Sequence, residues 1–274
     1  MADGDENVGT SDQPHSPTKE DLSKRFPKYD MDDKKRLVAY IFNHENFKNN
    51  RPESREGSSK DTEAFKAALI KLGFSERCIV DWPNLTTGEM SKVLENFNKD
   101  GRYENIGCFV CAIISHGHTN DTIFGKGRVP VGLHELLSYL TPEKCPSLSG
   151  VPKLIFTATC RGIERDKGID ISDEPEAEVN ETNFPIMADL LVFHACYNGY
   201  KSFTQTEGSW LMQSLSKILS KYGTKKEILT LLTAVSNHVA SLETKSSDEE
   251  KAHLKQMPQI VSTLLKELKF EAKK

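Results

Sequence analysis

The chain has 274 residues, of which 37% are hydrophobic, and its formal net charge is −4. A chain of this length buries one sizeable core or two small ones. Lysine and arginine are interleaved with aspartate and glutamate and form no basic stripe, so the sequence predicts no nucleic-acid partner. Its apolar runs fall short of the roughly 20 residues that cross a bilayer, so no membrane partner is expected either.

The N-terminal residues 1–28 are polar, acidic and rich in Ser, Asp, Glu and Pro, which predicts a disordered segment. They lack the charged-then-apolar pattern of a secretory signal peptide. The six cysteines lie mostly inside apolar segments, as reduced thiols do, so we expect a cytoplasmic protein without a disulfide framework. These cysteines are Cys78, Cys108, Cys111, Cys145, Cys160 and Cys196.

After this segment, strand and helix patterns alternate. Two apolar runs, "RLVAYIFNH" over 36–44 and "IGCFVCAIISHG" over 106–117, predict buried strands from their length and β-branched content. Between them, apolar residues at helical spacing predict helices over 59–74 and 86–99.

The second half of the chain continues this alternation. A short helix is predicted over 133–140, and buried strands over 153–160 and 188–197. Amphipathic helices are predicted over 208–223 and 227–244. Strands that alternate with helices predict an α/β domain with a mainly parallel sheet.

One segment interrupts the pattern. Residues 163–184 contain eight acidic and two basic residues and almost no apolar anchors. A long segment of this composition inside a compact domain is typical of a functional or disordered linker. It is also where a protease would cut most easily.

Two residues with the chemistry for catalysis follow predicted strands. His116 ends "CAIISHG" and Cys160 ends "LIFTATC". In parallel α/β sheets, sites form beyond the carboxyl ends of the strands, and an imidazole can deprotonate a thiol. A plainer alternative stays open at this point, because a lone cysteine is usually a small buried hydrophobe and a histidine before glycine is usually a turn residue.

Other cysteines and histidines indicate no metal site. Cys108 and Cys111 are three apart within a strand, so their side chains point to opposite faces and belong to the core. The pair His116 and His118 lacks further ligands at zinc-binding spacing. We therefore expect neither a metal nor another cofactor.

The segments "SHG" (115–117) and "FTATCRG" (156–162) resemble the caspases, whose signature is Q-A-C-[RQG]-G with a histidine about 50 residues upstream. Here the separation is 160 − 116 = 44 residues. The resemblance is strongest to executioner-type caspases and covers about residue 30 to the end. It also includes "AYIFNHENF", "SREGSSKDTEAF", "IFGKGRVPVGLHEL", "CPSLSGVPKL", "PIMADLLVFHA", "GSWLMQSL" and "QIVSTLLKELKF".

The resemblance implies a fold and a division of the chain. The fold would be a central, mainly parallel six-stranded sheet flanked by helices, with a two-fold dimer formed through the last strand. Residues 29–162 would form the large-subunit region, 163–184 the intersubunit linker and 185–274 the small-subunit region. The segment 257–270, which fits helix and strand equally well by its own pattern, would then contain the last strand.

The resemblance also implies catalytic roles. Cys160 would be the nucleophile and His116 the general base and acid. The backbone amides of Gly117 and Cys160 would form the oxyanion hole.

The substrate pocket departs from the family pattern. Caspases hold the substrate aspartate with two arginines and a glutamine; Arg55 in "SREG" matches the first arginine, but Ala158 replaces the glutamine. A gap-free alignment of "GYKSFTQTEGSW" places Thr204 at the second arginine, and only Lys201 is close enough in sequence to compensate. Because losing one partner of a buried ion pair costs about 3–5 kcal/mol, we expect turnover of aspartyl substrates to be close to absent.

Two functions are compatible with this pattern. The first and favoured one is a binding protein that regulates apoptosis by pairing with an active caspase paralogue, or by forming a homodimer, with little cleavage of its own. The alternative is a cysteine endopeptidase that uses Cys160 and His116 on a residue other than aspartate.

The acidic linker contains a possible processing site. "DISD" (170–173) resembles a caspase cleavage site, which would make Asp173 the residue cut by a relative. Such strings also arise by chance in acidic linkers, and Glu174 after the cut is unfavourable.

Overall fold

The computed structural model describes residues 25–48, 53–99, 103–127, 129–166 and 188–272. Most of the predicted N-terminal segment and of the acidic linker, including Asp173, lies outside the described residues. Among the described residues, no helix combines the length and apolar content that crossing a membrane requires.

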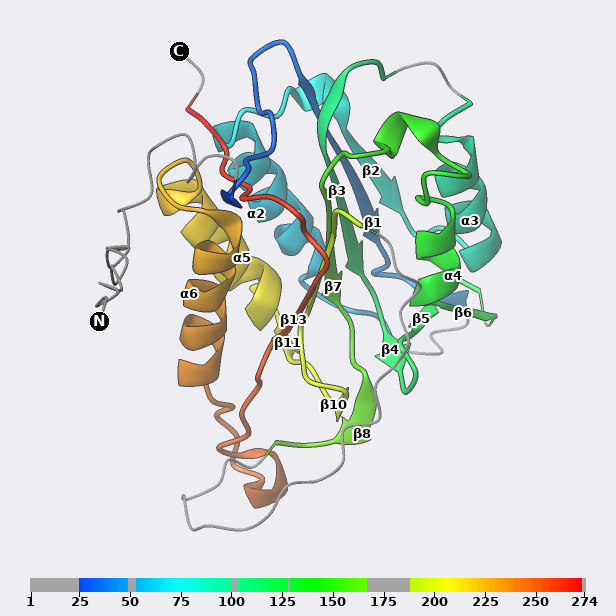
Figure 1. The fold of residues 1–274 in the computed structure, drawn as a ribbon. Helices are drawn as coiled ribbons and strands as arrows, with labels where there is room; N and C mark the ends of the chain where they lie inside the picture. Colours follow the sequence, from blue (N-terminus) through cyan, green and yellow to red (C-terminus); the bar gives the residue numbers. More distant parts are fainter. Residues whose placement is uncertain (1–24, 49–52, 100–102, 128, 167–187, 273–274) are drawn as a thin grey trace, which may run out of the picture.

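The core of the molecule is a six-stranded sheet in the order β13-β9-β7-β3-β1-β2 (Figure 1). Neighbouring strands from β2 to β9 are parallel, and β13 pairs antiparallel with β9 at one edge. The predicted mainly parallel, six-stranded fold is therefore confirmed. The strands are β1 (Arg36–Asn43), β2 (Ile79–Pro83), β3 (Ile106–Ile114), β7 (Lys153–Ala158), β9 (Leu190–His194) and β13 (Gln259–Ser262).

Helices cover both faces of this sheet, as Figure 1 shows. Alternate residues of the central strands pack into two separate hydrophobic clusters, one on each face. This two-sided burial explains why β3, β7 and β9 are continuous apolar runs. One face is covered by α2 (Ser58–Lys71), α5 (Trp210–Tyr222) and α6 (Ile228–Ser241), and the other by α3 (Thr87–Asn96) and α4 (Leu133–Ser138).

The two cysteines of β3 also pack on opposite faces of the sheet. Cys108 packs into the cluster under α2, α5 and α6, whereas Cys111 packs into the cluster on the opposite face. This confirms that they belong to the core. All six cysteines are free thiols.

Several short elements were not predicted. The edge strand β2 escaped detection because "IVDWP" carries an aspartate and a proline and is only half-buried, as edge strands often are. Short strands add small sheets around the ends of the main one: β4 (Gly117–His118), β5 (Thr122–Phe124), β6 (Pro130–Gly132), β8 (Gly162–Glu164), β10 (Gly199–Tyr200), β11 (Thr204–Gln205) and β12 (Gly208–Ser209). Single 3-10 turns are η2 (Glu76–Cys78), η3 (Pro146–Leu148) and η4 (Glu249–Lys251).

The ambiguous C-terminal segment is partly a strand. Residues 259–262 form β13, in which Ile260 lies opposite Phe193 of β9. Cross-strand pairing, which no local pattern reveals, decides this conformation.

Phe156 of β7 is a test of the core. Its ring is 1% exposed and contacts Phe65 and Phe193 edge-on, with centroids 5.5 and 6.5 Å away. Phe156→Ala should lower the free energy of unfolding by about 3–5 kcal/mol, because it leaves a cavity. Phe26→Ala, at a 61% exposed ring, is the control and should have little effect. Urea unfolding of both variants measures this, and equal effects would contradict the packing described.

Candidate active site

The strand register brings His116 and Cys160 together. Ile114 of β3 lies opposite Ala158 of β7, and each candidate follows its strand by two residues. Both therefore leave the same edge of the sheet and line one cleft of about 500 Å³. The cleft is lined by Glu53, Ser54, Arg55, Glu56, Ser115, His116, Cys160, Ser202, Thr204, Gln205 and Thr206.

Gly117 is required by close backbone packing. A Cβ atom at this position would overlap the carbonyl oxygen of Cys160 and lie 2.8 Å from Thr159 Cβ. Only glycine lets the chain after His116 pass this close to Cys160. The residue predicted to supply an oxyanion-hole amide is thus adjacent to the candidate nucleophile.

The ring of His116 is oriented by two contacts. Its Nε2 lies 2.7 Å from the carbonyl oxygen of Glu53, and its ring packs on Phe47 at a centroid distance of 5.0 Å. A carbonyl can only accept, so Nε2 carries the proton and Nδ1 is left as the basic nitrogen. Burial lowers the pKa of His116, the Glu53 carbonyl opposes this effect, and the charge of Arg55 adds to it. A neutral imidazole at pH 7 is the form that can accept a proton.

The thiol of Cys160 is half-buried and lies against Ser202. The backbone N–H of Ser202 donates to Sγ at 3.5 Å, and Sγ lies 3.7 Å from the Ser202 carbonyl oxygen and 3.6 Å from its hydroxyl. Among the described residues, these are the hydrogen-bond partners of Sγ, so reaction with a substrate requires the thiol to leave Ser202. Catalytic hydrogen bonds are often absent or long before substrate binds.

Arg55 and Thr204 line the cleft, whereas Ala158 is buried in the core cluster and reaches Arg55 with its backbone carbonyl. The Arg55 guanidinium is 7% exposed and donates from Nη2 to Thr204 Oγ1 at 3.0 Å and to the Ala158 carbonyl at 3.4 Å. Its Nη1 is buried and has no hydrogen-bond partner in the described part of the chain. Burial lowers the pKa of Arg55, against the attraction of Asp61. The Thr204 hydroxyl and the Ala158 carbonyl are therefore neighbours of Arg55, and the two N–H groups of Nη1 are unused among the described residues.

Asp61, which the sequence analysis missed, holds the hairpin that carries Thr204. This fully buried carboxylate accepts from the Ser209 N–H at 2.9 and 3.0 Å and from Gln213 Nε2 at 2.8 Å. Burial raises the pKa of Asp61, and the hydrogen bonds from Gln213 and Ser209 oppose that rise. Asp61 thus connects the first turn of α2 to the strands β11 and β12.

Arg161, directly after the nucleophile candidate, was also missed. The side chain of Arg161 is 2% exposed. Its guanidinium pairs with both carboxylate oxygens of Asp121, and the distance from Nη2 to Oδ2 is 3.1 Å. Its Nη1 also donates to the side chain of Gln259. Because Gln259 belongs to β13, Arg161 links the loop that contains Cys160 to the edge strand of the sheet.

Lys201 does not line this cleft. Its backbone N–H donates to Glu164, and the residue lines a neighbouring pocket with Tyr197 and Met257. Among the described residues, no group of three or more His, Cys, Asp or Glu side chains could hold a metal ion.

His44 is fully buried and its ring lies beside Phe47, so its protonation should change the stability of the fold near the cleft. Burial lowers its pKa to about 4, with the Leu85 carbonyl opposing and Arg55 adding to this effect. An unfolded histidine titrates near 6.5, so acid favours the unfolded chain. The free energy of unfolding should fall by about 2 kcal/mol from pH 7 to pH 5 through this group.

We expect His44→Leu to flatten that part of the pH profile, measured by urea unfolding at both pH values. The exposed His134→Leu is the matched control and should retain the full slope. An unchanged slope in His44→Leu would mean that His44 is protonated in the folded protein.

Comparisons with known proteins show the family to which the chain belongs. The family model "Caspase domain" matches residues 36–269. Caspase-1 of Spodoptera frugiperda is 33% identical over 274 residues, covering 96% of this chain and 88% of that protein. Caspase-3 of Mesocricetus auratus is 35% identical over 245 residues, covering 88% and 86%. The crystal structure of the Spodoptera caspase-1 superposes with a TM-score of 0.79 at 34% identity, covering 90% of this chain and 96% of that one. The chain belongs to the caspase family.

Proposed function

We propose that this chain regulates apoptosis by binding an active caspase and has little or no activity of its own after aspartate. The observation that carries this proposal is the surroundings of Arg55. Where the family resemblance implies glutamine and arginine side chains, the guanidinium meets only the Ala158 carbonyl and the Thr204 hydroxyl.

The chemistry of these two replacements weakens carboxylate binding. An alanine methyl donates no hydrogen bond, and a threonine hydroxyl is uncharged and already accepts from Arg55. A buried anion needs several charged or polar donors. A loss of about 4 kcal/mol corresponds to nearly a thousandfold lower turnover.

The edge strand β13 supports pairing with another chain. It lies at the end of the sheet, with β9 as its neighbour on one side. An edge strand presents backbone groups that another strand can pair with. The last strand of a second copy of this chain, or of an active caspase paralogue, could pair with this edge. Such pairing would change the activity of the paralogue if this chain binds its active conformation more or less tightly than its inactive one. Arg161 would connect such an interface to the Cys160 loop through Gln259.

The second candidate function is a cysteine endopeptidase with changed specificity. It is favoured by the convergence of His116, Gly117 and Cys160 on one cleft and by the unused Nη1 donor of Arg55. With Ala158 and Thr204 in place, this cleft would favour a small polar residue over aspartate.

Processing and location complete the proposal. The large-subunit region 29–162 and small-subunit region 185–274 would be separated by cleavage in 163–184, with Asp173 as the cut residue. The protein would act in the cytoplasm, where its free thiols stay reduced.

Mixing experiments distinguish the two functions. The full chain and its Cys160→Ala variant would each be titrated into an active executioner caspase while dye release from an Asp-ending peptide is followed. Regulation by binding predicts the same change in rate with both forms, because pairing does not need the thiol. An effect restricted to the form with Cys160 would support the endopeptidase, and no effect of either form would contradict regulation.

Restoring the carboxylate ligands should create activity. We expect the double variant Ala158→Gln with Thr204→Arg to raise kcat/KM on an Asp-ending peptide by at least roughly ten- to a hundredfold. A single hydrogen bond to a charge contributes about 1.5–3 kcal/mol, and two neighbouring contributions need not add. Thr206→Arg, at an exposed position of the same cleft, is the matched control. A gain from the control alone, or no gain from the double variant, would contradict this account of the pocket.

A further inference from the structure

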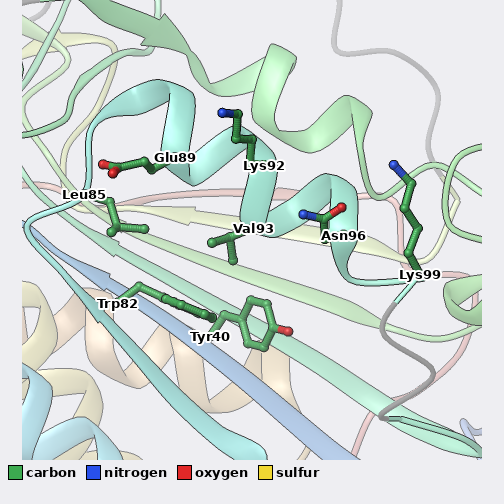
Figure 2. A pocket seen from close by; sticks show the side chains of 8 residues that line it. All are labelled: Tyr40, Trp82, Leu85, Glu89, Lys92, Val93, Asn96 and Lys99. Atoms are coloured by element: carbon green, nitrogen blue, oxygen red, sulfur yellow. The ribbon is translucent and has the colours of Figure 1, made fainter.

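A second cleft lies between the sheet and α3, on the face opposite α2 and α5. Figure 2 shows side chains from β1, β2 and α3 surrounding it. Its volume is about 500 Å³, within the range of small-molecule sites. It is lined by Tyr40, Trp82, Leu85, Glu89, Lys92, Val93, Asn96 and Lys99.

The floor of this cleft is aromatic. Tyr40 and Trp82 come from neighbouring strands, and their rings meet edge-on with centroids 6.0 Å apart. In Figure 2, Val93 of α3 lies over these two rings. Tyr40 is held in turn by Phe97 and Phe109, at centroid distances of 5.4 and 5.7 Å. Because Tyr40 is only 2% exposed, the half-buried Trp82 is the part of this rigid floor against which a flat ring can stack or pack edge-on.

The floor also has an unused donor. Trp82 Nε1 is buried and has no hydrogen-bond partner in the part of the chain that the structure describes. Leaving such a group unpaired costs about 1–3 kcal/mol. An occupant with an acceptor group that reaches the indole would recover part of that cost.

The rim of the cleft has unpaired positive charge. Lys92 is exposed and forms no ion pair with any described residue, whereas Lys99 pairs with Glu95 at 2.7 Å. Glu89 accepts from the Thr86 N–H and hydroxyl with Oε2, each at 2.7 Å, and keeps its negative charge. The end of the cleft at Lys92 and Asn96, further along α3 than Glu89, is the part that presents a cation to an occupant.

We propose that this cleft binds a small planar aromatic compound carrying a carboxylate, sulfonate or phosphate group. The ring would pack on Trp82 and Val93, with Tyr40 supporting Trp82 from below. The anionic group would lie at Lys92 and the neighbouring amide of Asn96, one helical turn further along α3. This site does not involve Cys160 and is independent of the proposed function.

The two tryptophans of the chain provide the measurement. In ¹⁵N-labelled full-length protein they give two indole N–H signals, and Trp82→Phe identifies that of Trp82. Naphthalene-2-sulfonate should shift the Trp82 signal saturably, while the Trp210 signal on the other face stays in place. Neutral naphthalene-2-methanol should bind more weakly.

Substitutions test the contribution of charge. Lys92→Gln should weaken binding roughly two- to fivefold, the effect of one exposed ion pair. Lys71→Gln, at an exposed lysine of α2, is the matched control and should bind like the unchanged protein. Val93→Glu, with folding checked by its melting temperature, should abolish binding.

Three results would overturn the proposal. The first is no saturable Trp82 shift up to about 5 mM of the sulfonate. The second is an equal shift of the Trp210 signal, which would show non-specific binding. The third is equal affinity for the neutral compound or for the Lys92→Gln variant, which would show that the anion is not recognised.

Discussion

The buried guanidinium of Arg55 determines the shape of the candidate active site. A cation removed from water needs acceptors, and Arg55 obtains them from two distant segments, at Ala158 and Thr204. Its own backbone N–H is held by Glu45, and the buried Asp61 balances its charge while anchoring the neighbouring hairpin. The arginine therefore stabilises the cleft even without substrate. Its presence alone does not indicate that the protein cleaves after aspartate.

The same reasoning applies to the candidate catalytic pair. His116 and Cys160 are neighbours because β3 and β7 end in register, and Gly117 is needed because the backbone passes so close. The scaffold thus fixes these positions whether or not chemistry occurs. In the proposed function, the donors around the substrate side chain decide the activity, and the side chains of Ala158 and Thr204 supply no charged donor.

The sequence allowed the strands buried on both faces to be predicted, because two-sided burial leaves a continuous apolar run. It did not reveal β2, whose Asp81 and Pro83 suit an edge, or the conformation of 259–262, which depends on pairing with β9. Alignment predicted Thr204 as a pocket residue, and its hydroxyl lies 3.0 Å from Arg55 Nη2 in the structure. Asp61 and Arg161 were missed because their partners lie far away in sequence, and such contacts leave no local pattern.

Alanine at position 158 and threonine at position 204 keep the backbone contacts of the fold. Ala158 still pairs with Ile114 in the sheet, and its carbonyl still accepts from the Ser115 N–H. Thr204 still pairs with Ser209 in the hairpin. Because these contacts use the backbone, the chain can lose the side chains that bind aspartate and retain its core and the edge strand β13. A caspase homologue altered only in this way would keep the sheet edge through which we propose that it pairs.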